Sequence, residues 1–303
     1  MSLFKDLLLK KNARMNSVPE ALQTVVEKQQ QRVLTRIIAQ VNSLETSGGK
    51  ILINSKNIDA IVRIADELKD VFLNDEYIKA VKAFGSQFEV QAILNIQIIE
   101  SSGFNISGDL SVANKYLDYV KRNAIKDLIS TQEFIRPLQS ILENAVATNA
   151  DFNETLENII NFVKGENGAD GKILKYVRSI SADTFAVSDR AFTKIVSDAI
   201  GADWFYYSGV ELKTSRCFCV ERVGHYFHKN EIEAWGAGKD IGFCETKPGQ
   251  WAGWREGTNE TTIFTFLGGW GPCTHSLMPV SFIAVPKPDV ERSIAGGYYK
   301  EAA

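Results

Sequence analysis

The sequence predicts a mostly α protein, in which a helical N-terminal region is followed by a small α+β C-terminal domain. Two observations carry this prediction. Through the first two hundred residues, apolar side chains recur at the three-and-four spacing of one helical face. By contrast, all four cysteines, all three histidines and all five tryptophans lie between Trp204 and His275. Because pattern and chemistry change near Gly201, we expect residues 1–200 and 202–303 to be distinct structural units.

Length and composition agree with this organisation and exclude several protein classes. A chain of 303 residues usually holds two domains, and a hydrophobic fraction of 45% supports a sizeable core. The net charge is −3 without a block of like charge, so nucleic acid is not an obvious direct partner. No apolar run approaches the roughly 18 residues of a membrane helix, and the first residues lack a secretory pattern. We therefore expect neither a membrane segment nor secretion.

The first long helix is predicted to begin at Val18-Pro19 and to end at Gly48-Gly49. Proline suits a first helical turn, and the glycines suit a helix end. The helix would have about seven turns. Asn57 is predicted to cap the second helix, whose apolar face runs from Ile58 to Phe72.

Further helices are predicted in the same manner up to Ile200. Residues 50–54 and 105–107 read equally well as short strands or as loops. The predicted helices cover residues 74–83, 87–99, 110–130, 131–149, 153–164 and 171–200.

This helical region offers no convincing catalytic or ligand-binding motif. Acidic residues such as Asp66, Glu67 and Asp70 lie among lysines on predicted exposed faces, which is typical of a solvated helix surface. The stretch 165–171 lacks the lysine and hydroxyl of a phosphate loop and the ligand pattern of a calcium loop. We interpret it as a turn between helices.

The C-terminal region has the composition of strands and aromatic packing. Trp204 to Leu212 is aromatic and β-branched and predicts a strand, Lys229 to Trp235 predicts a short helix, and the stretch 261–281 ends in a strand. A small domain needs large side chains to fill its core. The tryptophans expected to do so are Trp235, Trp251, Trp254 and Trp270.

The cysteines and histidines of this region offer a candidate metal site. Cys217 with Cys219, and Cys273 with His275, supply four ligands, which is the number that a tetrahedral zinc ion takes. The spacing within each pair is narrower than the usual two to four intervening residues. A crosslink between Cys219 and Cys273, or simple packing of these side chains, are the alternatives. Three further residues are potential ligands: His225, His228 and Cys244.

The order of motifs in residues 204–285 resembles the phage minor head protein family, typified by the head morphogenesis protein of phage Mu. The first motif is TSRCFCVERVGHYFHKNEIEAW, from Thr214 to Trp235. Trp251 to Asn259, Phe264 to Gly269 and the run PCTHSLMPV from Pro272 to Val280 follow in order. The helical region matches only in general character.

The resemblance implies a structural protein of the virion. On this reading the C-terminal domain is a compact docking module, and the helical region contacts portal, scaffold, other capsid proteins or sister copies. The protein would act in head morphogenesis, portal association and DNA delivery, meeting packaged DNA only indirectly. It would reside in the host cytoplasm during assembly and in the virion head or portal region afterwards. It would not be an enzyme; the competing hypothesis is a toxin-like effector or nuclease carried by the C-terminal domain.

The resemblance also implies that the segments around Cys219 and Cys273 come together, with His275 beside them. Two features depart from the family pattern. Thr274 stands where many relatives carry a basic residue, and Cys217 is an additional cysteine.

Overall fold

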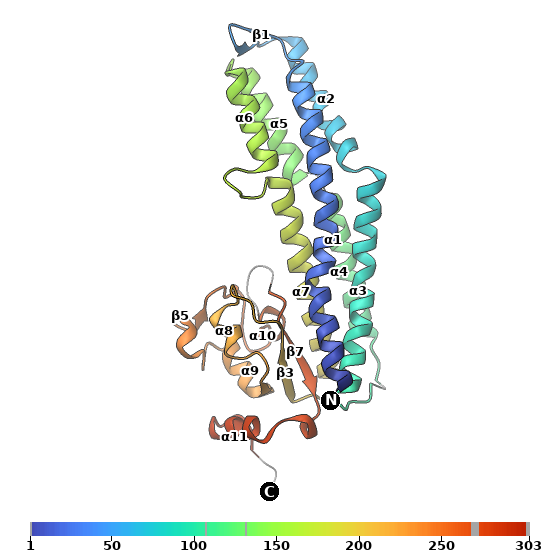
Figure 1. The fold of residues 1–303 in the computed structure, drawn as a ribbon, viewed down its shortest axis with the longest axis vertical. Helices are drawn as coiled ribbons and strands as arrows, with labels where there is room; N and C mark the ends of the chain where they lie inside the picture. Colours follow the sequence, from blue (N-terminus) through green and yellow to red (C-terminus); the bar gives the residue numbers. More distant parts are fainter. Residues whose placement is uncertain (1, 107, 131, 268–272, 301–303) are drawn as a thin grey trace. The chain divides into compact units, whose positions relative to one another are not determined.

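The computed structural model describes residues 2–106, 108–130, 132–267 and 273–300. It confirms the predicted fold class, because long helices form the N-terminal part and a few short antiparallel strands lie in the C-terminal part (Figure 1). The long helices are α1 (Ser2–Val41), α2 (Ser55–Phe72), α3 (Asp75–Ser101), α4 (Ser111–Ile129), α5 (Gln132–Ala147), α6 (Phe152–Lys164) and α7 (Lys172–Ala199).

Helix α1 begins much earlier than predicted and passes through Pro19 without ending. The expectation that Pro19 opens a helix was therefore wrong. Proline removes one helical hydrogen bond, but the buried apolar stripe continues on both sides of it. Phe4, Leu8 and Met15 are buried before the proline, and Leu22 is buried after it. Burial of this continuous face outweighs the local cost of the ring.

Two other helix boundaries also differ from prediction. Asn54, not Asn57, caps α2, because its side chain accepts a hydrogen bond from the backbone N–H of Asn57. The Asn57 side chain is buried and bonds the backbone of the preceding turn. The helices expected at 74–83 and 87–99 form one helix, α3, since Phe84 and Phe88 continue its buried face across Gly85.

The chain forms two compact units, neither of which is continuous in sequence. Unit 1 contains residues 1–18, 86–122 and 182–303, and unit 2 contains residues 19–85 and 123–181. Helices α1, α3, α4 and α7 each have one end in each unit. Gly201 therefore marks a change of secondary structure and does not separate the two compact units.

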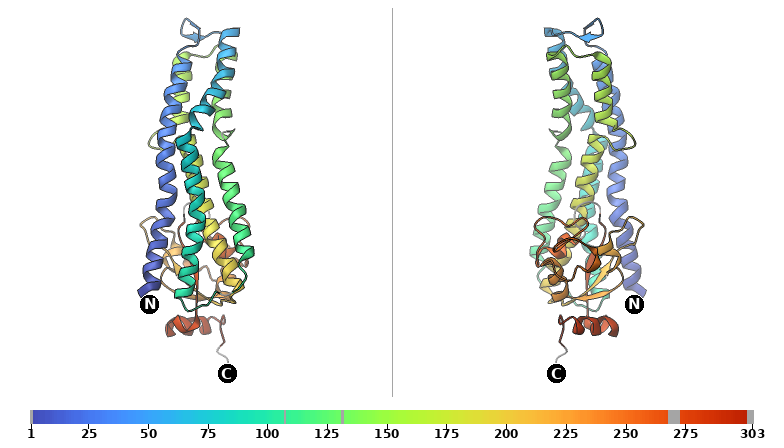
Figure 2. Two further views of the ribbon diagram at one scale, coloured as in Figure 1. Left: turned by 90° about the vertical axis from the view of Figure 1, so that its right-hand side faces the viewer. Right: turned by 90° about the vertical axis from the view of Figure 1, so that its left-hand side faces the viewer.

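Unit 2 is helical apart from a two-stranded hairpin. Its strands β1 (Thr46–Ser47) and β2 (Lys50–Ile51) are joined by Gly48 and Gly49, whose positive φ angles suit glycine in a tight turn. Helix α5 packs against both α2 and α6, and the long helices of this unit run in nearly the same direction in both views of Figure 2. Phe72, Tyr77 and Phe134 form an aromatic cluster at the core of this unit.

Unit 1 holds a three-stranded antiparallel sheet in the order β4-β3-β7. Strand β3 lies in the centre, with Phe205 opposite Phe227 on one side and Pro279 on the other. The unit's other elements are short helices and one further hairpin. The bounds are β3 (Trp204–Ser208), α8 (Cys217–Val220), β4 (Tyr226–His228), α9 (Lys229–Gly236), η1 (Gly242–Cys244), β5 (Glu245–Lys247), β6 (Gln250–Trp251), α10 (Ile263–Phe266), β7 (Ser276–Val280), η2 (Phe282–Ala284) and α11 (Lys287–Ala295).

Both faces of the central strand are covered. Phe205 and Tyr207 point into a core that α8, α9 and α10 complete. On the opposite face, Tyr206 meets Phe4 of α1, with ring centroids 5.9 Å apart. The end of α3 also reaches the sheet, because the Ser102 hydroxyl donates a hydrogen bond to the Pro279 carbonyl over 2.9 Å. Alternation along a strand explains this double burial, since every second side chain needs its own cover.

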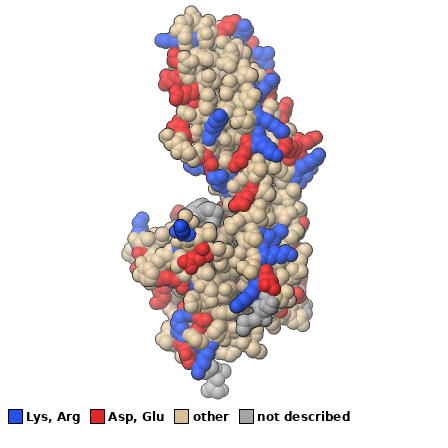
Figure 3. Space-filling model, in the orientation of Figure 1, with Lys and Arg blue, Asp and Glu red and all other residues tan. Residues whose placement is uncertain are grey.

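The surface carries both signs of charge. On the face drawn in Figure 3, basic and acidic side chains are interspersed. None of the helices among the described residues combines the length and the apolar character that crossing a bilayer requires.

Candidate functional site

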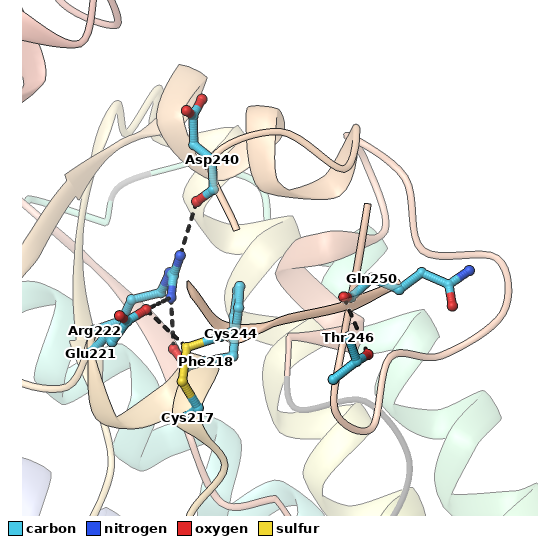
Figure 4. Close-up of a disulfide and its surroundings, with 8 residues drawn as sticks. All are labelled: Cys217, Phe218, Glu221, Arg222, Asp240, Cys244, Thr246 and Gln250. Atoms are coloured by element: carbon cyan, nitrogen blue, oxygen red, sulfur yellow. Dashed lines mark hydrogen bonds and ion pairs between the residues drawn. A yellow bond between two sulfur atoms is a disulfide. The ribbon is translucent and has the colours of Figure 1, made fainter. Parts of the chain in front are cut away.

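Cys217 does not join the predicted four-ligand cluster but forms a disulfide with Cys244 (Figure 4). The geometry of helix α8 explains why Cys217 points away from the cluster. Residues two apart on a helix point about 200° away from each other, so Cys217 and Cys219 leave opposite sides of this single turn. The disulfide joins α8 to η1 across a sequence separation of 27 residues, with Cα atoms 5.5 Å apart. The sequence left a local bridge open but did not identify this pair.

Arg222 packs beside the disulfide and, like it, links α8 to the region of η1 (Figure 4). Its guanidinium donates hydrogen bonds to the Phe218 carbonyl of α8 and to the Asp240 carbonyl just before η1. It also lies over the rings of Phe218 and Trp235, 4.0 and 4.6 Å from their centroids. A buried charge held by carbonyls and aromatic faces stabilises this loop without needing a metal.

Cys219, Cys273 and His275 come together as predicted. Each offers a ligand atom, all three atoms lie within 4.8 Å of one another, and all three residues are buried. The distance from Cys273 Sγ to His275 Nδ1 is 3.4 Å. Two zinc ligands at their usual bond lengths and a tetrahedral angle would be about 3.6 Å apart. The described residues thus form a three-ligand cluster that can hold a metal ion, with Cys219 and Cys273 as free thiols rather than a crosslink.

The surroundings shift the pKa values of the two thiols in opposite directions. A hydrogen bond to Cys273 and then burial raise the pKa of Cys219. The same hydrogen bond from Cys219, aided by His275 and the charge of Arg190, holds the pKa of Cys273 well below its usual range despite burial. The pair therefore favours a thiolate on Cys273 that accepts the S–H of Cys219. Thiolates are the form in which cysteine binds metals and acts as a nucleophile.

Arg190 of α7 holds the backbone of the segment that carries Cys273 and His275. Its Nη1 donates to the carbonyl oxygens of Cys273 and His275, over 3.0 and 3.3 Å. Its Nε donates to the Thr265 carbonyl over 2.7 Å. These bonds position two of the three cluster residues from outside the cluster.

Gly209 leaves the space that the imidazole occupies. A Cβ atom at Gly209 would lie 2.1 Å from Cδ2 of His275, which is far inside van der Waals contact. The ring of Tyr207 also packs near this imidazole, with ring centroids 5.8 Å apart. The His275 Nε2 atom is buried and has no hydrogen-bond partner among the described residues. The ring orientation is thus set by packing on Gly209 and Tyr207.

A pocket of about 240 Å³ opens beside the cluster. Cys219, Cys273 and His275 all line it, together with Arg216. A Cβ atom at Gly253 would lie 2.4 Å from the Arg216 guanidinium carbon, so the guanidinium packs directly on that glycine. The remaining wall is partly apolar and partly hydroxyl-bearing, formed by Val210, Leu212, Thr214, Ser215 and Thr274.

The other predicted ligands lie elsewhere. His228 caps α9, because its Nδ1 accepts a hydrogen bond from the backbone N–H of Asn230 over 3.2 Å. His225 lies 3.4 Å from a carboxylate oxygen of Asp289. Neither belongs to a ligand cluster among the described residues.

Of the four tryptophans expected in the core, the three that the structure describes lie in it or pack against it. Trp235 and Trp251 are buried in the core of the small sheet, and Trp251 stacks on Phe218 with centroids 4.2 Å apart. Trp254 is partly buried and packs against this core. Trp270 lies outside the described residues.

Sequence reasoning missed the residues that support the cluster. Arg190 and Gly209 belong to no motif that relates them to Cys273, and Arg190 belongs to a helix expected to lie outside the C-terminal domain. Arg216 lies within the first motif, but the sequence assigned it no role. A basic residue within an otherwise buried helical face was the one available signal for Arg190.

Comparison of the chain with models of protein families, with curated proteins and with solved structures found no match.

Proposed function

We propose that this chain is a bacteriophage minor head protein that acts in head assembly, portal association and DNA delivery. Its activity would be binding. The helical region would present exposed faces to portal, scaffold, capsid proteins or sister copies, and the cysteine-rich part would be a compact docking module. The observation that carries the proposal is the ordered set of motifs between Thr214 and Val280 that resembles the minor head family.

The architecture around those motifs supports the same proposal. Residues from the first and last motifs, Cys219 and His275, share one buried cluster, so these motifs belong to one structural centre. The Cys217 to Cys244 disulfide is compatible with a protein that leaves the reducing cytosol in a particle. The proposal does not depend on either feature alone.

The direct test is mass spectrometry of purified virions, together with the fate of particles that lack the gene. The proposal expects the protein in finished particles, and expects its loss to give empty or non-infectious heads. Normal, infectious particles without the protein would overturn it. Presence during assembly but absence from finished particles would restrict it to a transient morphogenesis role.

A surface variant tests where the helical region binds. Ile58 and Val62 lie one turn apart on α2 and are 50% and 60% exposed, so they form an apolar strip on an otherwise polar face. Glutamates at both positions should reduce co-purification with portal by about tenfold, since burying two new charges opposes docking. Arg63→Glu, an exposed charge change on the same helix, is the matched control and should bind normally.

We further propose that the cluster of Cys219, Cys273 and His275 holds a zinc ion. Two thiolates and an imidazole are a preferred donor set for zinc. When bound, the ion would connect α8 to the segment before β7, in place of the hydrogen bond between Cys219 and Cys273. Arg190 and Gly209 would hold the ligands in place.

Metal analysis of protein purified without chelator tests the zinc. One equivalent of zinc per chain is expected, with less than a tenth remaining in Cys219→Ser and Cys273→Ser. A Cys217→Ser/Cys244→Ser variant is the matched control, because it also removes two cysteines but leaves the cluster intact. Zinc loss in this control, or no zinc in the wild-type chain, would contradict the assignment.

One observation favours catalysis by the same region as a second candidate function. Cys273, whose pKa its surroundings hold well below the usual range, lines an open pocket with His275 and Arg216. These are the components of a thiol nucleophile with a base and an anion-stabilising cation. A toxin-like effector would inhibit growth of a host cell that expresses it, and Cys273→Ser would relieve the inhibition. Equal growth with both forms would remove this candidate.

A further inference from the structure

The cluster supplies three ligands, while zinc takes four. Among the described residues, no fourth cysteine, histidine or carboxylate oxygen joins the three ligand atoms. The neighbouring residues 268–272 have the sequence Gly-Gly-Trp-Gly-Pro, which contains no side chain that zinc prefers. A protein side chain is therefore not the source of the fourth ligand in this part of the chain.

The pocket gives the cluster access to a ligand from solvent. Cys219, Cys273 and His275 all belong to its wall, so a shared metal ion would border the pocket. A volume of about 240 Å³ leaves room for water or a small anion. Three protein ligands and one exchangeable position distinguish open zinc sites from closed structural ones.

The charges around the pocket favour an anion as the fourth ligand. A zinc ion with two thiolates and a neutral imidazole has no net charge, so an added anion leaves one negative charge uncompensated. Arg216 lies in the same wall, with its guanidinium packed on Gly253. The hydroxyls of Thr214, Ser215 and Thr274 line the pocket as well and can donate hydrogen bonds to an anion.

We infer that the metal at Cys219, Cys273 and His275 keeps a fourth position that faces the pocket and takes a small anion, whose charge Arg216 balances. The inference rests on the proposed zinc site and deepens it, because it makes the site a ligand-binding one. Metal binding would release to solvent the one proton that the Cys219–Cys273 pair holds, and the anion would then replace a bound water. No electron is transferred in either step.

Cobalt(II) in place of zinc gives this site a spectroscopic signal, and azide is the probe anion. The full chain should bind one equivalent of cobalt and develop thiolate-to-cobalt absorption, and azide should then shift the visible bands in a saturable manner. No cobalt binding would overturn the zinc proposal itself. Cobalt binding with bands that azide leaves unchanged would keep the metal and overturn the open position.

Variants at Arg216 test the selection of anions. Arg216→Met should retain cobalt stoichiometry but bind azide about tenfold more weakly, since a nearby charge is lost. Arg216→Lys should recover part of this affinity. Lys213 is an exposed basic residue between Leu212 and Thr214 that does not itself line the pocket. Lys213→Met is therefore the matched control and should titrate like the wild type. Equal azide affinity in wild type and Arg216→Met would show that Arg216 has no part in the site.

Discussion

At the scale of single residues, the centre of unit 1 depends on small spaces and buried charges. Gly209 is the clearest example, because its missing side chain is the space that His275 fills. Gly209 does not have a positive φ, so its role is steric rather than conformational. Such a role cannot be recognised from the sequence, in which Gly209 lies inside the strand predicted from Trp204 to Leu212, whereas β3 ends at Ser208.

Gly209→Ala should therefore displace the imidazole and lower the free energy of unfolding by about 1 to 3 kcal/mol, as overpacking does. Bound zinc should fall in the same variant. Denaturant unfolding and metal analysis measure the two effects. Gly108→Ala is the control, since a Cβ atom there meets nothing within 4 Å. Unchanged zinc in Gly209→Ala would mean that His275 is not a ligand.

At the same scale, the carboxyl group of Glu231 on α9 makes the stability of the fold depend on pH. Burial raises its pKa to about 7, with Asp240 and Asp289 adding to the shift while Arg292 and Arg222 oppose it. Its Oε1 lies 3.7 Å from Nε of Arg292. The unfolded chain has a carboxyl pKa near 4.3, so between these values the folded state binds more protons than the unfolded state.

The stability that Glu231 contributes is thus complete below about pH 4.3 and is lost as pH rises through about 7. Relative to Glu231→Gln, the wild-type chain should lose up to ~3 kcal/mol across this range. Urea unfolding of both chains from pH 4 to 8 measures the difference. Parallel stability curves would show that the carboxyl is not protonated in the fold.

At the scale of elements, a buried ion pair joins three helices of unit 1. Lys11 of α1 donates hydrogen bonds to Asp189 of α7 over 2.7 Å and to Asn95 of α3 over 2.8 Å. Gln91 and Asn95 donate to the same carboxylate. Both charged side chains are fully buried, and burial lowers the pKa of Lys11. The arrangement fixes which faces of these helices meet.

Lys11→Met should reduce the free energy of unfolding by about 3 to 5 kcal/mol, because it leaves a buried carboxylate without its cation. Lys11→Met/Asp189→Asn should recover most of the loss, since the charge is gone and the amide still bonds its neighbours. Thermal and denaturant unfolding measure both. If the double variant were as unstable as the single one, lost packing rather than lost charge would be the cause.

The disulfide connects elements within the small sheet region. Closing a separation of 27 residues should stabilise the fold by ~3.5 kcal/mol through the entropy of the unfolded chain. Cys217→Ser/Cys244→Ser, or a reducing agent, should lower stability by about 2 to 4 kcal/mol. Denaturant unfolding with and without reductant measures this, and the double serine variant should not respond to reductant.

At the scale of the whole molecule, the cysteine-rich region is not a separate compact unit. It shares unit 1 with residues 1–18 and 86–122 and with the second half of α7. Phe4 and Ser102 cover the face of the sheet that α8, α9 and α10 do not cover. A fragment of residues 202–303 would expose that face and lose Arg190 as well.

We therefore expect the isolated fragment 202–303 to bind a hydrophobic dye and to unfold without a cooperative transition. Far-UV and near-UV circular dichroism during heating, compared with the full chain, measure this. A cooperative transition with the tryptophan signal of the full chain would show that the fragment folds alone.

The sequence by itself determined the fold class, the bounds of several helices and the meeting of Cys219, Cys273 and His275. Helical periodicity is local, so α4, α6 and α7 end within a residue or two of prediction. The cluster followed from the resemblance of ordered motifs, not from spacing.

Only the tertiary structure decided the partner of Cys217, the path of α1 through Pro19 and the boundaries of the two units. Each depends on which distant surfaces meet. Cys217 pairs with Cys244 because one turn of α8 directs it away from Cys219. Helix α1 continues through Pro19 because its buried face continues. Such contacts between segments far apart in the chain have no local sequence pattern, and they also create the pocket beside the cluster.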